Sequence, residues 1–178
     1  IESPEAKKIR VKGAQQTRLA ENKEYLKDKN VQAFLKAIAD AEGGGYDFKY
    51  GAVKGKKNDP WRFTDFSTHP GAGSGGTTTA SGMYQITKDT WNDHGVNVMG
   101  LTDFTPETQD LIAVDILRRL DVIDKIKAGN IAGSMKKAAT RWAALPQGPG
   151  LANRYPPQPY VKYEHFIAAY KNFGGTEQ

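Results

Sequence analysis

The sequence predicts a mainly α-helical (α+β) domain, a helical bundle with a small β-hairpin or sheet that lines a cleft. Two features of the 178-residue chain predict this class. Several long stretches repeat apolar residues at the spacing of an amphipathic helix. Between residues 43 and 80, in contrast, the chain is rich in Gly, Thr, Ser and Asp and holds only short alternating segments. A chain of this length can bury one substantial core.

Residues 1–30 are predicted to form a charged N-terminal arm, and residues 31–178 the folded domain. The arm has too few apolar residues to build a core of its own, although residues 16–27 have the pattern of a helix that lies on the domain. None of the motifs discussed below falls in the arm. We therefore expect it to be dispensable for activity, whatever it contributes to stability.

The first helix of the domain is predicted over residues 31–42. Phe34, Leu35 and Ile38 recur at helical spacing, and Glu42 follows Ile38 by four residues. Glu42 is therefore expected on the buried face of this helix, directly before three glycines that end it.

After this helix, short alternating segments predict a hairpin between residues 46 and 66. The next helices are predicted to end at glycine or proline and cover 83–95 (stopped by Gly95), 105–129, 130–146 (capped by Asn130) and about 163–173. The helix over 105–129 has the clearest boundaries. Thr105 can cap it, Pro106 suits its first position, and Gly129 can stop it.

The composition narrows the classes of partner. A net charge of +5 and a pI near 9.3 favour polyanions such as nucleic acid, anionic lipid or bacterial cell wall. The basic residues are spread along the chain without a base-reading motif, so nucleic-acid binding is not expected. No apolar run approaches the ~20 residues of a membrane span, and no secretion signal is recognisable.

No cofactor or metal is expected. Cysteine is absent, which excludes disulfides, thiolate metal sites and thiol nucleophiles. His69, His94 and His165 are too far apart in the sequence for a zinc-binding His pair on one helix. The glycine-rich stretch at 71–76 lacks both a preceding strand and a following lysine, so it is not a phosphate-binding loop.

Glu42 is a candidate catalytic acid. The end of a helix disfavours negative charge through the helix dipole, and an apolar face disfavours it through desolvation. Both effects raise the pKa of a carboxyl group, and a carboxylic acid that keeps its proton near neutral pH can protonate a glycosidic oxygen. Taken alone, however, a glutamate at a helix end is more often a solvated surface residue.

A second motif, TTTASGMYQIT at residues 77–87, strengthens the catalytic interpretation. Small residues and a glycine precede Met83, Tyr84 and Gln85. The amide of Gln85 can both donate and accept hydrogen bonds, which suits a sugar hydroxyl or acetamido group.

Together the two motifs resemble the goose-type lysozyme and lytic transglycosylase superfamily, which has a lysozyme-like fold. Their order is most similar to the lambda-phage lysozyme type. The segments that carry this resemblance are FLKAIADAEG with GYDFKYG, FTDFSTHP, SGMYQITKDTW, LTDFTPETQD, RWAALP and FGGT. They also resemble the wall-degrading lysin carried in the virions of enveloped double-stranded RNA phages.

The resemblance implies roles for individual residues. Glu42 matches the catalytic acid/base, and Gln85 matches the glutamine that holds the N-acetyl sugar. The other residues implied to contact substrate, in the wall or floor of the cleft, are Met83, Tyr84, Asp65, Ser67, His69 and Trp142, the last as core or cleft floor. Two positions depart from the bacterial enzymes: Gly43 stands where many have serine, and RWAALP replaces their Ala-Tyr-Asn stretch.

The implied function is cleavage of the β-1,4 bond between N-acetylmuramic acid and N-acetylglucosamine in peptidoglycan glycan strands. A monomeric enzyme of this kind would act from the virion or in the host periplasm and cell wall, at entry or lysis. A second carboxylate would decide between hydrolysis and internal transfer, and Asp47, Asp59 and Asp65 are candidates. Two alternatives remain: a peptidoglycan endopeptidase, for which no nucleophile or metal pair is evident, and a non-catalytic wall-binding virion protein.

Overall fold

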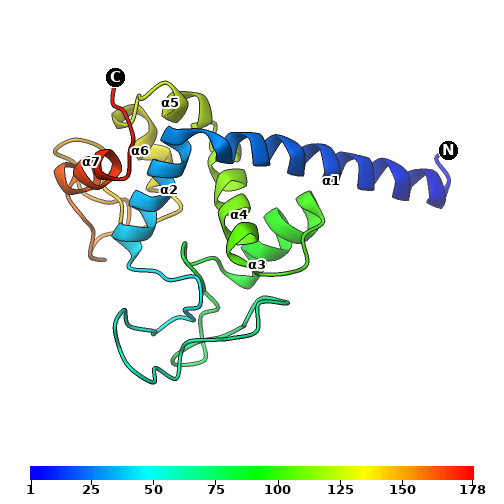
Figure 1. The fold of residues 1–178 in the computed structure, drawn as a ribbon, viewed down its shortest axis with the longest axis horizontal. Helices are drawn as coiled ribbons and strands as arrows, with labels where there is room; N and C mark the ends of the chain where they lie inside the picture. The colour runs from blue at the N-terminus through cyan, green and yellow to red at the C-terminus, as the bar shows by residue number, and fades with distance from the viewer.

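Seven α-helices and one π-helix make up the regular structure of the computed structural model, which describes residues 1–178 (Figure 1). The elements are α1 (Pro4–Lys27), α2 (Lys29–Glu42), α3 (Lys88–Thr90), η1 (Trp91–Asn97), α4 (Pro106–Arg119), α5 (Ile123–Lys127), α6 (Ala132–Ala138) and α7 (Tyr163–Asn172). The mainly helical class predicted from the sequence is confirmed. None of these helices is long and apolar enough to cross a bilayer.

Helix α2 runs through the helical body and leads into the irregular region at residues 43–80 (Figure 1). It packs against α7, α5, α1 and α4. Its apolar face is buried as predicted, with Phe34, Leu35 and Ile38 at most 2% exposed. The Phe34 ring meets the Phe166 ring of α7 edge to face, with 5.3 Å between centroids. Each such buried side chain stabilises the fold by roughly 1.5–3 kcal/mol.

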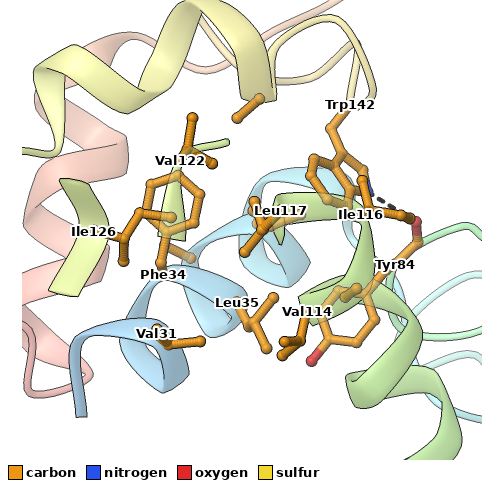
Figure 2. Packing of buried hydrophobic residues seen from close by; sticks show 14 of the residues in the cluster. Val31, Phe34, Leu35, Tyr84, Val114, Ile116, Leu117, Val122, Ile126 and Trp142 are labelled. Atoms are coloured by element: carbon orange, nitrogen blue, oxygen red, sulfur yellow. Dashed lines mark hydrogen bonds between the residues drawn. The ribbon is translucent and has the colours of Figure 1, made fainter. Parts of the chain in front are cut away.

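The core continues from α2 across α4 and α5. Figure 2 shows Leu35 close to Val114 and Leu117 of α4, and Phe34 close to Ile126 of α5. All belong to one cluster of 30 buried residues. Glu42, at the end of α2, is therefore carried by a helix that packs into this core.

The hairpin expected between residues 46 and 66 is not formed. Only one antiparallel bridge, between Phe48 and Arg62, joins its two halves. The chain between them turns through left-handed conformations at Gly51, Gly55 and Asn58. Asp59 fixes these turns by accepting the backbone N–H groups of residues 53 and 61, at 2.8 and 2.9 Å. Side-chain bonds of this kind compete with a strand ladder.

The helix expected over 83–95 begins later and ends later. Thr87 caps α3 through its side chain, and the helical path continues as η1 through Gly95 to Asn97. Residues before Thr87 are held in a bridge between Ser81 and Ile86 instead. Gly95 does not stop the helix. A Cβ there would lie 3.0 Å from Ile112, so its role is to let η1 pack closely on α4.

The helix expected over 105–129 is confirmed at both ends but broken in the middle. The Thr105 hydroxyl caps α4, Pro106 is its first residue, and Gly129 (φ +84°) follows α5. Between them the chain adopts a left-handed conformation at Asp121 (φ 59°), which separates α4 from α5.

The helix expected over 130–146 is short. Asn130 accepts the N–H of Gly133 at 3.0 Å, as a capping residue does, but α6 ends at Ala138. The chain then turns so that the indole N–H of Trp142 donates to the carbonyl of Tyr84 at 3.1 Å, in place of a continued helix (Figure 2).

Helix α1 includes nearly all of the expected arm and has two different halves. Residues 1–12 are all exposed and project from the body (Figure 1). Farther along, Asn22 is fully buried and donates to Asp115 of α4 at 2.9 Å, and Arg18 pairs with the same carboxylate at 2.7 Å. The second half of α1 is therefore fastened to the helical body.

Candidate active site

Glu42 is the last residue of α2, and the glycine after it explains why the helix ends there. Gly43 takes the left-handed conformation (φ 70°) that terminates helices, and its N–H still bonds to the carbonyl of Ala39 at 2.9 Å. The last turn of α2 carries no basic residue. Glu42 therefore sits at the negative end of the helix dipole without a neighbouring cation on its own helix.

Burial raises the pKa of the Glu42 carboxyl above its ordinary value, and the backbone N–H of Ala144 partly opposes this by bonding to the carboxylate. The side chain is half-buried. A half-buried carboxyl with a raised pKa holds its proton more strongly than a solvated one and can still reach a bound substrate, as a general acid must.

Gly44 brings the two sequence motifs together. A Cβ at this position would overlap the carbonyl oxygen of Met83 and lie 2.9 Å from that of Gly82. The main chain after Glu42 thus packs directly on the main chain before Gln85. The role of this glycine is close backbone approach, which links residues some forty positions apart in the sequence.

The side chain of Gln109, on α4, holds together the two main-chain segments that meet at Gly44. This fully buried side chain accepts the N–H of Met83 at 2.9 Å and donates to the carbonyls of Tyr46 and Phe104, both at 3.0 Å. One side chain therefore ties the two motif segments to α4. Gln109 is not among the residues expected from the sequence, although a polar residue three positions before Ile112, on an apolar stripe, is a usable signal.

The next residue, Asp110, completes the support. It accepts hydrogen bonds from the hydroxyls of Tyr46 at 2.8 Å and Tyr84 at 2.6 Å. Burial, together with the nearby Asp110 charge, raises the pKa of Tyr46 to about 12 and that of Tyr84 well above its ordinary value. Both tyrosines are therefore fixed donors, and their role is structural.

Gln85 is held in a rare conformation. Its backbone is left-handed (φ 52°), which costs a residue other than glycine on the order of 1–2 kcal/mol. Its side-chain nitrogen donates to the carbonyl of Gly82 at 3.0 Å, and the residue is half-exposed. Strain of this kind is concentrated at functional positions, and here it presents the amide at the surface of the turn.

Three of the residues implied to contact substrate are largely buried, as was one of the two expectations for Trp142. Tyr84 and Trp142 are each 3% exposed and belong to the core (Figure 2). His69 is also buried: its Nε2 bonds to the Ile86 carbonyl at 2.9 Å, and its ring packs 4.7 Å from that of Phe104. These side chains support the segment around Gln85, and Tyr84 and Trp142 also line a hollow of about 210 Å³ together with Gln85.

The other expected residues lie at the surface. Asp65 and Ser67 are exposed and bonded to each other, since the Asp65 carboxylate accepts both the hydroxyl (2.6 Å) and the backbone N–H (2.9 Å) of Ser67. Met83 is half-exposed beside Gly44. No group of three His, Cys, Asp or Glu side chains is placed to hold a metal ion.

All three candidates for a second catalytic carboxylate are engaged elsewhere. Asp47 accepts two bonds from Arg62, at 2.8 and 2.6 Å. Asp59 caps the turns described above, and Asp65 is bonded to Ser67. The structure therefore offers Glu42 as an acid without a free carboxylate partner among these three.

A helix-terminal carboxylic acid, mounted on a helical domain beside an irregular lobe, defines a lysozyme-like enzyme. A sequence model of the family described as Endolysin matches residues 32–177. The chain belongs to this family, and it is a peptidoglycan-degrading phage lysin. The lambda-type lysozyme resemblance is confirmed, whereas the double-stranded RNA phage identification stays a prediction.

Individual relatives agree with this. The endolysin of Escherichia phage P2 is 34% identical over 165 residues, covering 83% of this chain and 94% of that protein. The endolysin of Escherichia phage lambda is 29% identical over 163 residues, which cover 82% of this chain and 91% of that protein. A structure of bacteriophage lambda lysozyme complexed with a chitohexasaccharide superposes with a TM-score of 0.69 at 27% identity, covering 84% of this chain and 97% of the other. A second structure of lysozyme from bacteriophage lambda superposes with a TM-score of 0.64 at 26% sequence identity, and again covers 84% of this chain and 97% of the other.

Proposed function

We propose that the chain is a lytic transglycosylase that cleaves the β-1,4 bond between N-acetylmuramic acid and N-acetylglucosamine, with Glu42 as its acid and base. The observation that carries this proposal is the half-buried carboxyl of Glu42 at the end of α2, where burial raises its pKa. The similarity to a lysozyme that binds a chitohexasaccharide supports a glycan substrate.

In the proposed mechanism Glu42 first gives its proton to the glycosidic oxygen as the bond from C1 breaks. The acetamido oxygen of the muramic acid attacks C1 and forms a cyclic intermediate. The Glu42 carboxylate then takes the proton of the 6-hydroxyl, whose oxygen displaces the acetamido group from C1. The product is a 1,6-anhydro sugar, and the acid regains its proton.

The engagement of Asp47, Asp59 and Asp65 supports transfer over hydrolysis. A retaining hydrolase needs a carboxylate nucleophile about 5–5.5 Å from the acid, and an inverting one needs a base about 6.5–9.5 Å away. A nucleophile supplied by the substrate removes this need. Gln85 would orient the acetamido group for attack, since its amide can donate to the acetamido oxygen.

The test is Glu42→Gln assayed on purified cell walls, with the products of both proteins identified by mass spectrometry. We expect the wild type to release fragments with anhydro-muramyl ends and the variant to release none. Glu164→Gln, an exposed change in the first turn of α7, is the matched control and should retain activity. Peptide-only fragments would indicate an endopeptidase, and no release by the wild type a wall-binding protein.

We also propose that residues 31–178 hold the whole site and that residues 1–30 serve stability. Deleting residues 1–12, all exposed, should change neither turnover nor melting temperature. Deleting residues 1–30 removes the bonds of Arg18 and Asn22 to Asp115 and should lower the melting temperature while sparing turnover at low temperature. A folded 31–178 fragment without activity would contradict this division.

The place of action proposed is the bacterial cell wall, reached from the virion or from the host side at lysis. A monomer suffices for the chemistry, because Glu42 and Gln85 belong to one chain. Sedimentation at working concentration tests the oligomeric state, and immunodetection in purified virions tests the association with the particle.

A further inference from the structure

A cavity of about 440 Å³ lies beside the end of α2 but does not include Glu42 in its lining. Lys36 and Asp40 of α2 line it, together with Gly44 and Gly45. Successive residues of an α-helix are about 100° apart, so Glu42 is rotated about 200° from Asp40 around the helix. Ala39, which also lines the cavity, is only about 60° from Glu42 around the helix, so the cavity extends from beside the acid around one side of α2.

The charge of the cavity wall is mostly positive. Lys36, Lys54 and Arg62 contribute to it, against the single acidic residue Asp40. Arg62 is already held by the carboxylate of Asp47 at 2.6 Å. Neither lysine forms an ion pair within 4 Å and both are exposed, so both ammonium groups can meet a negatively charged ligand, although the charge of Lys36 also acts to lower the pKa of Asp110.

The floor of the cavity is apolar. The Phe48 ring is 7% exposed, Met83 is half-exposed, and Phe173 after α7 is 39% exposed. Arg62 lies over the Phe48 ring, 5.9 Å from its centroid, which fixes the guanidinium at the rim. A ligand that combines carboxylates with small apolar groups would match both features of the cavity.

We infer that this cavity binds the acidic peptide carried by N-acetylmuramic acid, an inference that rests on the proposed function. That peptide combines alanine methyl groups with free carboxylates, which match the apolar floor and the two unpaired lysines. Sequence distance permits simultaneous binding: Gly44 is two residues from Glu42, at most about 7 Å along the chain, and four extended residues span about 13–14 Å. A glycan at Glu42 can thus deliver its peptide past the glycines.

The binding test uses N-acetylmuramyl-tetrapeptide, which has no glycosidic bond to cleave, titrated calorimetrically into the full chain. We expect Lys36→Glu/Lys54→Glu to bind about tenfold more weakly, equal to about 1.4 kcal/mol, and the affinity of the wild type to fall with added salt. Lys7→Glu/Lys8→Glu, on the exposed end of α1, makes the same charge change and should bind as the wild type does. Equal affinity in all three proteins would overturn the inference.

The turnover test compares cell walls with glycan strands from which an amidase has removed the peptides. On intact walls the Lys36→Glu/Lys54→Glu protein should show a KM raised about tenfold at unchanged kcat. On peptide-free strands it should match the wild type, and a loss of the same size there would refute peptide recognition. If the wild type cleaves neither substrate the proposed function fails, and the calorimetric result still decides whether the cavity binds the peptide.

Discussion

Replacing Asp115 by asparagine tests how α1 is fastened to the domain. The carboxylate is fully buried and accepts bonds from Arg18 Nε at 2.7 Å, His94 Nδ1 at 2.8 Å and Asn22 Nδ2 at 2.9 Å. Burial by itself raises the pKa of Asp115, but the bonds from His94, Arg18 and Asn22 outweigh it and lower the pKa from 3.8 to about 2.

This shift sets the size of the expected effect. Each pKa unit corresponds to about 1.4 kcal/mol, so the bonded carboxylate contributes about 2.5 kcal/mol to the free energy of unfolding at pH 7. We expect Asp115→Asn to lose about that much, which for a chain of this size lowers the melting temperature by roughly 5–10 °C. The partly exposed Arg18 limits the loss, since its charge can turn to solvent.

The pH dependence has a definite sign. Because the folded-state pKa is depressed, the stabilisation is fully present above the unfolded pKa near 4 and is lost as the pH falls toward about 2. Urea denaturation followed by circular dichroism measures the free energy of unfolding of the wild type and of Asp115→Asn. The difference between the two proteins should be the same at pH 7 and pH 5 and smaller at pH 3.5.

A matched control separates this network from ordinary surface charge. Asp93 pairs with Arg119 at 2.9 Å but is 55% exposed, so Asp93→Asn should cost less than about 1 kcal/mol. The reasoning is refuted if Asp115→Asn is as stable as the wild type at pH 7, or if its deficit is the same at pH 7 and pH 3.5.

Three further outcomes are expected. Glu42→Gln should match or exceed the wild type in melting temperature at pH 8, and any gain should be smaller at pH 5, because the stability that goes with a raised pKa is lost from the wild type as the pH rises through that pKa. Gln109→Ala should lower the free energy of unfolding by about 3 kcal/mol in urea titrations, since it leaves the N–H of Met83 and two carbonyls unpaired. Gly44→Ala should reduce both stability and wall cleavage, whereas Gly13→Ala, in open helix, should stabilise by up to about 1 kcal/mol.

Each of these has a contrary result. A Glu42→Gln protein that is equally destabilised at pH 5 and pH 8 would mean that local partners satisfy the carboxylate. A fully stable Gln109→Ala protein would mean that water replaces the three hydrogen bonds made by the Gln109 side chain. If Gly44→Ala kept full activity, the close contact of the two main chains would not matter to the site.

The periodicity of apolar residues correctly predicted the features of the fold that depend on burial of one helix face. The spacing of Phe34, Leu35 and Ile38 located Glu42 at the end of α2 correctly, because a buried face repeats with the helix turn. Local capping chemistry likewise predicted Thr105 at the start of α4. These features follow from interactions within a few residues of each other along the chain.

Features set by distant contacts could not be predicted. His69 reads as a polar residue in a loop, yet the Ile86 carbonyl and the Phe104 ring bury it. The sequence predicts that Gly95 ends a helix, yet in the structure the absence of a side chain at Gly95 lets Ile112 of α4 pack against it. The hairpin failed for a local reason instead, since Asp59 bonds to main-chain N–H groups within six residues of itself and supplies partners that a second strand would otherwise provide.

The first half of α1 is an exposed helical segment that projects from the helical body. At 1.5 Å per residue, the helix start at Pro4 stands about 20 Å from the anchor at Arg18. Because that anchor fixes the helix to α4, a dye or tether attached near Glu5 keeps a constant direction relative to Glu42. Polarised fluorescence from such a dye would then report how the enzyme is oriented while it works on a wall.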